Sequence, residues 1–186
     1  MILSDKSILR EINAGKLIFE PSIEDKDISP CSVDVHLGDT VYRFKKYHEA
    51  IIKSIDLGHP DVATALKELT EPIPIPNEGY RLKSREFVIS FTKERITLPP
   101  YISARLEGRS TNARFGISIH STAPTVHPTW SGRLALEICN QGEVPCTLRK
   151  GMAIGQLIFE YVDSMPTRTL DSVWQKRDHP MFEASE

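Results

Sequence analysis

The sequence is poor in cysteine, with only Cys31, Cys139 and Cys146 in 186 residues and no C-x-x-C pair. Three cysteines far apart cannot build a disulfide framework, and a zinc knuckle needs closely paired ligands, so neither is indicated. The zinc nucleobase deaminases carry H-x-E followed by P-C-x-x-C. No H-x-E occurs in this chain, and no second cysteine follows Pro145-Cys146 at that spacing. We expect the three cysteines to be small buried apolar residues.

An excess of charge of one sign is also absent, with 23 Lys and Arg against 25 Asp and Glu, a formal net charge of −2. A nucleic-acid partner held by a basic face is therefore not expected. The longest apolar runs, such as 153–159, are far shorter than the roughly 20 residues of a spanning helix, and no lipid-binding stretch stands out. The first residues include Asp5 and no secretory apolar region. We expect a cytoplasmic protein with no membrane partner.

The length and the 40% apolar content fit a single domain over residues 1–186, ending in a polar tail at 164–186. Apolar residues at helical spacing between Ser4, an N-cap candidate, and Gly15 predict a first helix. A second short helix is expected over 61–69 because its apolar residues share one side.

Three prolines in alternate positions follow the second helix, Pro72, Pro74 and Pro76. Proline lacks a backbone N–H and is disfavoured in helices and interior strands. We therefore predict that residues 70–79 form a surface connection.

Short turn-bounded segments rich in β-branched and aromatic residues predict the strands. They lie at 17–19, 32–37, 40–44, 86–92, 102–106, 117–121, 133–140, 146–148 and 154–161. Many short strands with two or three short helices are typical of an all-β barrel or sandwich. The expected fold class is therefore mainly β.

A stretch with Arg109, Ser110, Thr111 and Arg114 follows the predicted strand 102–106. Ser110 is an N-cap candidate, with Thr111 as the alternative, and Arg114 lies one helical turn further on. A helix start flanked by two guanidinium groups suits a phosphate or polyphosphate, although the spacing is not that of a P-loop. An ordinary capped turn with solvated arginines is the alternative interpretation.

The predicted strand 133–140 places its branched apolar residues in alternate positions, so that they share one face. Glu137 lies on the opposite face, between the small Ala135 and the apolar Cys139. Partial desolvation there would suit Glu137 for general acid–base catalysis. A solvent-facing strand glutamate is the alternative.

The turn before this strand contains His127, Pro128 and Trp130. Pro128 and Trp130 are suited to wall a pocket for a flat ring, unless Trp130 is a core residue. His127 is either catalytic or an ordinary polar residue of the surface.

A set of short motifs runs in order through residues 1–162. They are Ser32-Val33-Asp34-Val35, Gly108-Arg109-Ser110-x-x-Ala113-Arg114-x-Gly116, Thr122-Ala123, Pro128-x-Trp130-x-Gly132, Leu136-Glu137, Gly151-Met152 and Gln156-Leu157-Ile158-Phe159. In type and spacing they resemble the dCTP deaminase branch of the trimeric dUTPase superfamily. The resemblance implies a distorted β-barrel or jelly-roll protomer, assembled as a homotrimer with active sites between subunits.

The resemblance also implies a role for each matching position. Glu137 matches the carboxylate that activates the attacking water, and Ser110 and Arg114 support it. Arg109, Ser110 and Arg114 match residues that bind the triphosphate. The other positions that the resemblance implies are Ala123, which lines the cytosine and water site, and Trp130, an aromatic residue of the nucleotide loop. We also predict substrate contacts for Thr111, His127, Ala135, Gln156 and Lys176.

The implied reaction is attack of water on C4 of dCTP, which gives dUTP and ammonia in pyrimidine deoxynucleotide metabolism. Glu137 accepts the proton of the water and returns it to the ring nitrogen. The implied cofactor is Mg²⁺ carried on the triphosphate, with no zinc and no metal bound by the protein itself. The implied partners are dCTP as substrate and dTTP as inhibitor.

Two departures from the family pattern leave alternatives open. His127 stands where relatives usually have Asp or Glu, and the tail lacks both the tyrosine and Lys-Tyr pattern of the deaminases and the Gly-rich motif of dUTPases. Gln175, Lys176 and Arg177 are candidate substitutes over the triphosphate, and Trp174 is a candidate for stacking. The alternatives are a dUTPase or a bifunctional dCTP deaminase and dUTPase, or a non-catalytic nucleotide-binding regulator.

Overall fold

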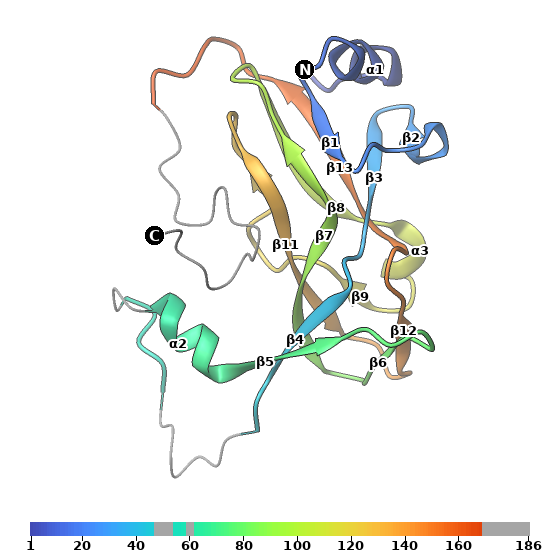
Figure 1. Cartoon of the computed structure of the whole chain (residues 1–186), viewed down its shortest axis with the longest axis vertical. Coiled ribbons are helices and arrows are strands. Elements are labelled where there is room, and N and C mark those ends of the chain that lie inside the picture. The colour runs from blue at the N-terminus through green and yellow to red at the C-terminus, as the bar shows by residue number, and fades with distance from the viewer. Residues whose placement is uncertain (47–53, 59–61, 169–186) are drawn as a thin grey trace.

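The computed structural model describes residues 1–46, 54–58 and 62–168 (Figure 1). The elements are α1 (Asp5–Asn13), β1 (Ile18–Glu20), the 3-10 helix η1 (Asp25–Asp27), β2 (Ile28–Ser29), β3 (Ser32–His36), β4 (Thr40–Phe44), α2 (Val62–Leu69), β5 (Thr70–Pro74), β6 (Tyr80–Leu82), β7 (Phe87–Thr97), β8 (Ile102–Gly108), α3 (Ser110–Ala113), β9 (Ile117–Ser118), β10 (Thr125–Val126), β11 (Ser131–Asn140), β12 (Cys146–Leu148) and β13 (Ala153–Tyr161). The described part of the chain is mainly β with three short α-helices, which confirms the predicted class. None of these helices is long and apolar enough to cross a bilayer.

The strands form two large sheets and one small one. The first has the order β5-β4-β7-β11-β9, with β1 also paired to β7, and the second has the order β10-β8-β13-β3-β2. The remaining pair is β12 and β6. Side chains of both large sheets, such as Leu136 of β11 and Leu157 of β13, belong to one buried apolar cluster. The sheets therefore pack face to face as open layers, and in the described residues neither closes into a barrel.

Helix α1 is attached to the second sheet through Glu11. The Tyr101 hydroxyl donates to Glu11 Oε2 at 2.9 Å, and the Tyr161 hydroxyl donates to Glu11 Oε1 at 2.8 Å. Burial alone would raise the pKa of Glu11, but these hydrogen bonds and the neighbouring Arg10 outweigh it and lower that pKa. The helix starts after Ser4 as predicted, although the Ser4 side chain makes no capping hydrogen bond.

The first half of the proline-rich segment after α2 is an edge strand, β5. The prediction of a surface connection over 70–79 was therefore wrong for residues 70–74, whereas residues 75–79 do connect β5 to β6. Strand β5 pairs with β4, with Pro72 opposite Tyr42 and Pro74 opposite Thr40. Prolines two residues apart have their missing N–H on the same side of a strand. That side faces away from β4, because the N–H of Ile75, which is on the other side, donates to the Asp39 carbonyl at 2.7 Å.

A bulge in β7 sets the course of β11. Arg133 pairs with Arg95 whereas Ala135 pairs with Phe91, so β7 holds extra residues between these pairs. Thr92, which is fully buried, fixes this irregularity. Its Oγ1 accepts a hydrogen bond from the Leu134 N–H at 3.0 Å and donates to the carbonyl of Glu94 at 2.7 Å.

The expectation that all three cysteines are buried was wrong. Cys31 is exposed, because it lies in the turn between β2 and β3, and Cys139 and Cys146 are half-buried. All three are free thiols.

Candidate active site

The alternation predicted for β11 is present. Leu134, Leu136 and Ile138 are buried between the sheets, and Glu137 is half-buried on the opposite face. In the register with β7, Glu137 lies opposite Ile89. The carboxylate is therefore carried by a central strand whose neighbours fix its position.

A second, smaller apolar cluster lies on this outer face of the first sheet. Tyr42, Ile89 and Phe91 are its buried members, and Leu66 of α2 packs against them. The rings of Tyr42 and Phe91 meet edge to face, with centroids 5.8 Å apart and planes at 81°. Glu137 thus stands beside an apolar surface of the sheet.

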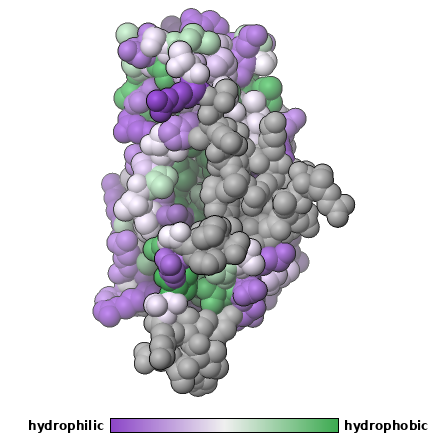
Figure 2. All heavy atoms as spheres, turned by 90° about the vertical axis from the view of Figure 1, so that its left-hand side faces the viewer, coloured by the Kyte–Doolittle hydropathy of each residue, from purple (hydrophilic) through white to green (hydrophobic). Residues whose placement is uncertain are grey.

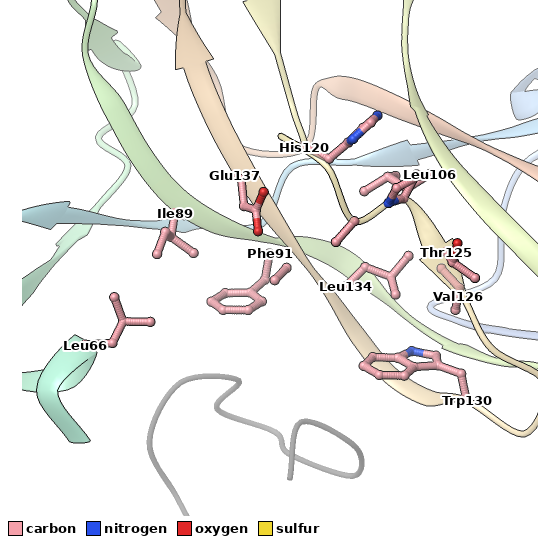
Figure 3. Close-up of a pocket in the computed structure, with 13 residues that line it drawn as sticks. Leu66, Ile89, Phe91, Leu106, His120, Thr125, Val126, Trp130, Leu134 and Glu137 are labelled. Carbon is pink, nitrogen blue, oxygen red and sulfur yellow. The ribbon is translucent and has the colours of Figure 1, made fainter. Parts of the chain in front are cut away.

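A cavity of about 410 Å³ opens over this surface. It is lined by Leu66, Ile89, Phe91, Leu106, His120, Ala123, Pro124, Thr125, Val126, Trp130, Leu134, Ala135 and Glu137. The face shown in Figure 2 is hollowed, and apolar surface gathers in the hollow. In Figure 3 the Glu137 carboxylate lies close to Phe91, with Leu66 and Trp130 on different sides of the same space. Such a volume, mostly apolar with few polar groups, is typical of a small-molecule site.

The loop after β9 holds the Glu137 carboxylate. The backbone N–H of Ser121 donates to Glu137 Oε2 at 2.9 Å, and the Glu137 N–H donates to the carbonyl of Ile119 at 2.8 Å. Within the described residues, Oε1 of Glu137 has no hydrogen-bond partner. One carboxylate oxygen is therefore fixed, and the other is available to a molecule in the cavity.

Trp130 combines the two roles that its sequence position left open. Its ring packs against the main core and also lines the cavity. The indole N–H donates to the Gly132 carbonyl at 3.2 Å, and the Trp130 backbone N–H donates to the His127 carbonyl at 3.2 Å. These contacts fix an aromatic wall against which a flat ring can stack.

His120 is a cavity residue that the sequence analysis missed. Its Nε2 lies 4.0 Å from Glu107 Oε2, and its Nδ1 is buried without a hydrogen-bond partner in the described residues. Ile117 and Ile119 point into the core, so alternation in the predicted strand 117–121 places His120 on the outer face. This alternation is visible in the sequence and could have identified His120. The contributions of Leu66 and Phe91 depend on distant packing and had no local signal.

The structure brings together some of the residues predicted for the site and separates others. Ala123, Trp130, Ala135 and Glu137 share the cavity. The predicted residues that do not line it are Arg109, Ser110, Thr111, Arg114, His127 and Gln156. Lys176, like Trp174, Gln175 and Arg177, lies outside the described residues.

The turn that carries Arg109 differs from the prediction. Helix α3 has only four residues, and its N-cap position is Arg109, in an extended conformation, so Ser110 begins the helix and is not its cap. Ser110, Thr111 and Arg114 are exposed. Gly116, with φ of 81°, ends the turn as predicted.

Gln156 and His127 also have defined surroundings. The Ser32 hydroxyl donates to Gln156 Oε1 at 2.9 Å, and Gln156 Nε2 donates to the Gly108 carbonyl at 3.3 Å. Both ends of this side chain are therefore engaged within the protein. His127 is exposed at the surface.

Residues 2–162 match the family model of dCTP deaminase-like proteins. The chain belongs to the dCTP deaminase-like family. Members with curated names include a "dCTP deaminase, dUMP-forming" of Mycobacterium sp. (strain KMS), 42% identical over 158 residues, which are 84% of this chain and 78% of that protein. The "dCTP deaminase" of Psychromonas ingrahamii is 38% identical over 172 residues, which are 90% of this chain and 87% of that one.

A solved structure of this family has a similar fold. It is the 2'-deoxycytidine 5'-triphosphate deaminase from Agrobacterium tumefaciens, with a TM-score of 0.66 and 23% identity over 85% of this chain. This chain spans about half the length of that protein, since the match covers 48% of it. The likeness shows that the described part of this chain shares its fold with that protein.

Proposed function

We propose that this member of the dCTP deaminase-like family hydrolyses dCTP to dUTP and ammonia in pyrimidine deoxynucleotide metabolism. The observation that carries the proposal is the half-buried Glu137 on the wall of a cavity of about 410 Å³. The Ser121 N–H fixes one oxygen of that carboxylate, and Trp130 supplies a flat wall for a pyrimidine. General-base groups need this kind of fixed position beside the reacting atoms.

In the proposed reaction, a water molecule in the cavity attacks C4 of the cytosine. Oε1 of Glu137 takes one proton of the water as its oxygen bonds to C4, and the carboxylic acid then delivers that proton to the ring nitrogen N3. The tetrahedral C4 carries a hydroxyl and the amino group. Glu137 moves the hydroxyl proton to the amino group, the C4–N bond breaks, ammonia leaves, and the C4 carbonyl of uracil forms. The small side chains of Ala123 and Ala135 leave room for the ring.

The phosphate-binding part of the proposal involves a second subunit. Arg109, Ser110, Thr111 and Arg114 bind the triphosphate of the substrate, which arrives as its Mg²⁺ complex. None of these residues lines the cavity of its own chain. In the homotrimer that we propose, they serve the cavity of a neighbouring subunit, where Ser110 and Arg114 also support Glu137.

The proposal also covers the remaining substrate contacts, the domain organisation, inhibition and the location of the protein. His127, Gln156 and Lys176 complete the substrate contacts. We also propose a single domain with a tail over 164–186, inhibition by dTTP, a cytoplasmic location, and no nucleic-acid or membrane partner.

The protein itself is proposed to bind no metal, zinc included. No cluster of three or more His, Cys, Asp or Glu side chains is placed to hold a metal ion within residues 1–46, 54–58 and 62–168.

A second candidate function is a bifunctional enzyme that continues from dUTP to dUMP and pyrophosphate. The observation that favours it is the name of the Mycobacterium relative, "dCTP deaminase, dUMP-forming", at 42% identity. A dUTPase without deaminase activity and a non-catalytic nucleotide-binding regulator are the remaining alternatives.

The decisive experiment incubates the protein with Mg²⁺ and dCTP and measures ammonia, dUTP, dUMP and pyrophosphate. Ammonia with equimolar dUTP supports the first proposal, and ammonia with dUMP and pyrophosphate supports the second. The Glu137→Gln variant should release at least about 100-fold less ammonia while it still binds dCTP. Binding of dCTP by the wild type without any product would overturn both proposals in favour of a regulator.

A further inference from the structure

An ion pair connects Arg109, in the turn that is proposed to bind the triphosphate, to Asp34 of β3 in the second sheet. Nη2 of Arg109 lies 3.0 Å from Oδ2 of Asp34, and the Asp34 side chain is only 14% exposed, against 39% for that of Arg109. Among the described residues, Arg109 is the one cation within ion-pair distance of Asp34. The other N–H groups of the guanidinium have no hydrogen-bond partner in the described residues and remain available to phosphate oxygens.

The strand register explains why these two residues meet. In the order β3-β13-β8, Asp34 pairs with Gln156, and Gln156 pairs with Glu107. The hydrogen bonds of Gln156 to Ser32 and to the Gly108 carbonyl connect β3 to the end of β8, directly before Arg109. Both the carboxylate and the backbone from which Arg109 projects are therefore fixed by the same three strands.

The charges around Asp34 make its pairing with Arg109 significant. The pKa of Asp34 is raised, chiefly by burial and also by the neighbouring Asp27, although Arg109 and His36 act in the opposite direction and lower it. Behind it, His36 Nδ1 lies 2.8 Å from Glu94 Oε1, and His36 Nε2 lies 3.5 Å from Asp27 Oδ1. A half-buried carboxylate with acidic groups nearby needs its cationic partner, since an unpaired buried charge is costly. Asp34 thus gives the Arg109 guanidinium an ion-pair partner within its own chain.

We propose that Asp34 is a positioning residue that holds the guanidinium of Arg109 in the orientation in which it binds the triphosphate. This inference rests on the proposed function. A long arginine side chain that is already ordered loses less conformational freedom when it binds a phosphate. Asp34 acts only through Arg109 and touches neither the pyrimidine nor the reacting water.

The test compares steady-state deamination of dCTP by the wild type, Asp34→Asn, Arg109→Gln and the double variant. Asp34→Asn should raise the KM for dCTP about three- to tenfold and leave kcat within about twofold. The double variant should behave like Arg109→Gln alone, because Asp34 has no effect without its partner. Glu160→Gln, which breaks the 2.8 Å pair with Arg105 on the same sheet, is the matched control and should leave KM unchanged.

Inhibition by deoxycytidine separates positioning from general structural damage. Deoxycytidine has no phosphate, so its Ki should be the same for Asp34→Asn and the wild type, whereas damage to the fold would weaken both ligands. Should Asp34→Asn fail to fold, Asp34→Glu keeps the charge but displaces the guanidinium, and the same rise in KM for dCTP is expected.

The inference would be overturned by an unchanged KM for dCTP, by equal losses of affinity for dCTP and deoxycytidine, or by additive increases of KM in the double variant. None of these results would affect the proposed function. A wild-type protein that releases no ammonia from dCTP would overturn the proposed function first. The two failures are therefore distinguishable.

Discussion

The backbone N–H of Ser121 and Oε2 of Glu137 are joined by a hydrogen bond of 2.9 Å. Hydrogen bonds to a charged carboxylate contribute about 1.5–3 kcal/mol, and this one also determines which oxygen faces the cavity. The donor is a main-chain group, so its contribution depends on the course of the loop and not on the serine side chain.

Ser121→Pro, which has no N–H, should therefore lower kcat for deamination by about 10- to 100-fold. Ser121→Ala keeps the N–H and is the matched control, with kcat expected within about twofold of the wild type. Ammonia release under saturating dCTP measures both variants, and thermal unfolding checks that the proline is tolerated. Equal activity of the two variants would contradict the assigned role of this hydrogen bond.

Trp130 should contribute to substrate binding through its ring. Stacking of a base on an aromatic side chain is worth about 1–3 kcal/mol, so Trp130→Ala should raise the KM for dCTP at least about fivefold. Trp130→Phe retains an aromatic face and should raise it much less. If alanine and phenylalanine raise KM equally, the ring does not stack on the substrate and Trp130 acts as a core residue only.

Glu11 should make the stability of the protein depend on pH in the acidic range. Its pKa in the folded state is lowered from 4.5, so the unfolded chain binds the proton more readily. The stabilisation is therefore fully present above pH 4.5 and is lost as the pH falls through the folded-state pKa.

The free energy of unfolding of Glu11→Gln at pH 7 should be about 1–3 kcal/mol lower than that of the wild type, because the variant loses the charge-assisted hydrogen bonds from Tyr101 and Tyr161. Urea unfolding at pH 7 and pH 3.5 should show a smaller difference from the wild type at the lower pH. The exposed Glu20→Gln is the control, with an expected change within about 0.5 kcal/mol. A difference that grows toward acid would have the wrong sign for this explanation.

Thr92 should be important for stability out of proportion to its size. Thr92→Val keeps the shape but leaves the buried N–H of Leu134 without its acceptor, which costs about 1–3 kcal/mol. Thr97→Val, which removes a 2.9 Å contact with the Ser131 hydroxyl in a half-buried position, should cost less. Urea unfolding of both variants measures the difference, and equal losses would show that the bulge does not depend on Thr92.

Local patterns were enough to predict much of the first sheet and part of the site. The alternation of Leu134, Leu136 and Ile138 is a property of consecutive residues, and it placed Glu137 on the correct face. The same kind of pattern was sufficient for α1 and for β4, whose bounds agree with the prediction.

The failures have a different origin, because they depend on which segments become neighbours. Pro72 and Pro74 fit in β5 because this strand lies at the edge of the sheet and the positions of their missing N–H groups face away from β4. The Asp34 partner of Arg109 and the Leu66 wall of the cavity also result from pairings between distant segments. The separation of Arg109 from the Glu137 cavity has no local pattern behind it, and only the family resemblance, which implies active sites between subunits, gave a reason to expect it.

That separation allows inactive chains to repair one another. Arg114, which is proposed to support Glu137 from a neighbouring subunit, does not line the cavity of its own chain either. In the proposed trimer, a subunit with Arg114→Gln still offers an intact Glu137, and a subunit with Glu137→Gln still offers an intact Arg114. Equal amounts of the two inactive variants are unfolded and refolded together, so that trimers form by random mixing. About a quarter of the active sites should then be native, because each site needs one intact residue from each of two neighbouring subunits and each is present in half of the chains. The activity that the mixed trimers regain therefore shows whether one active site is built from two chains.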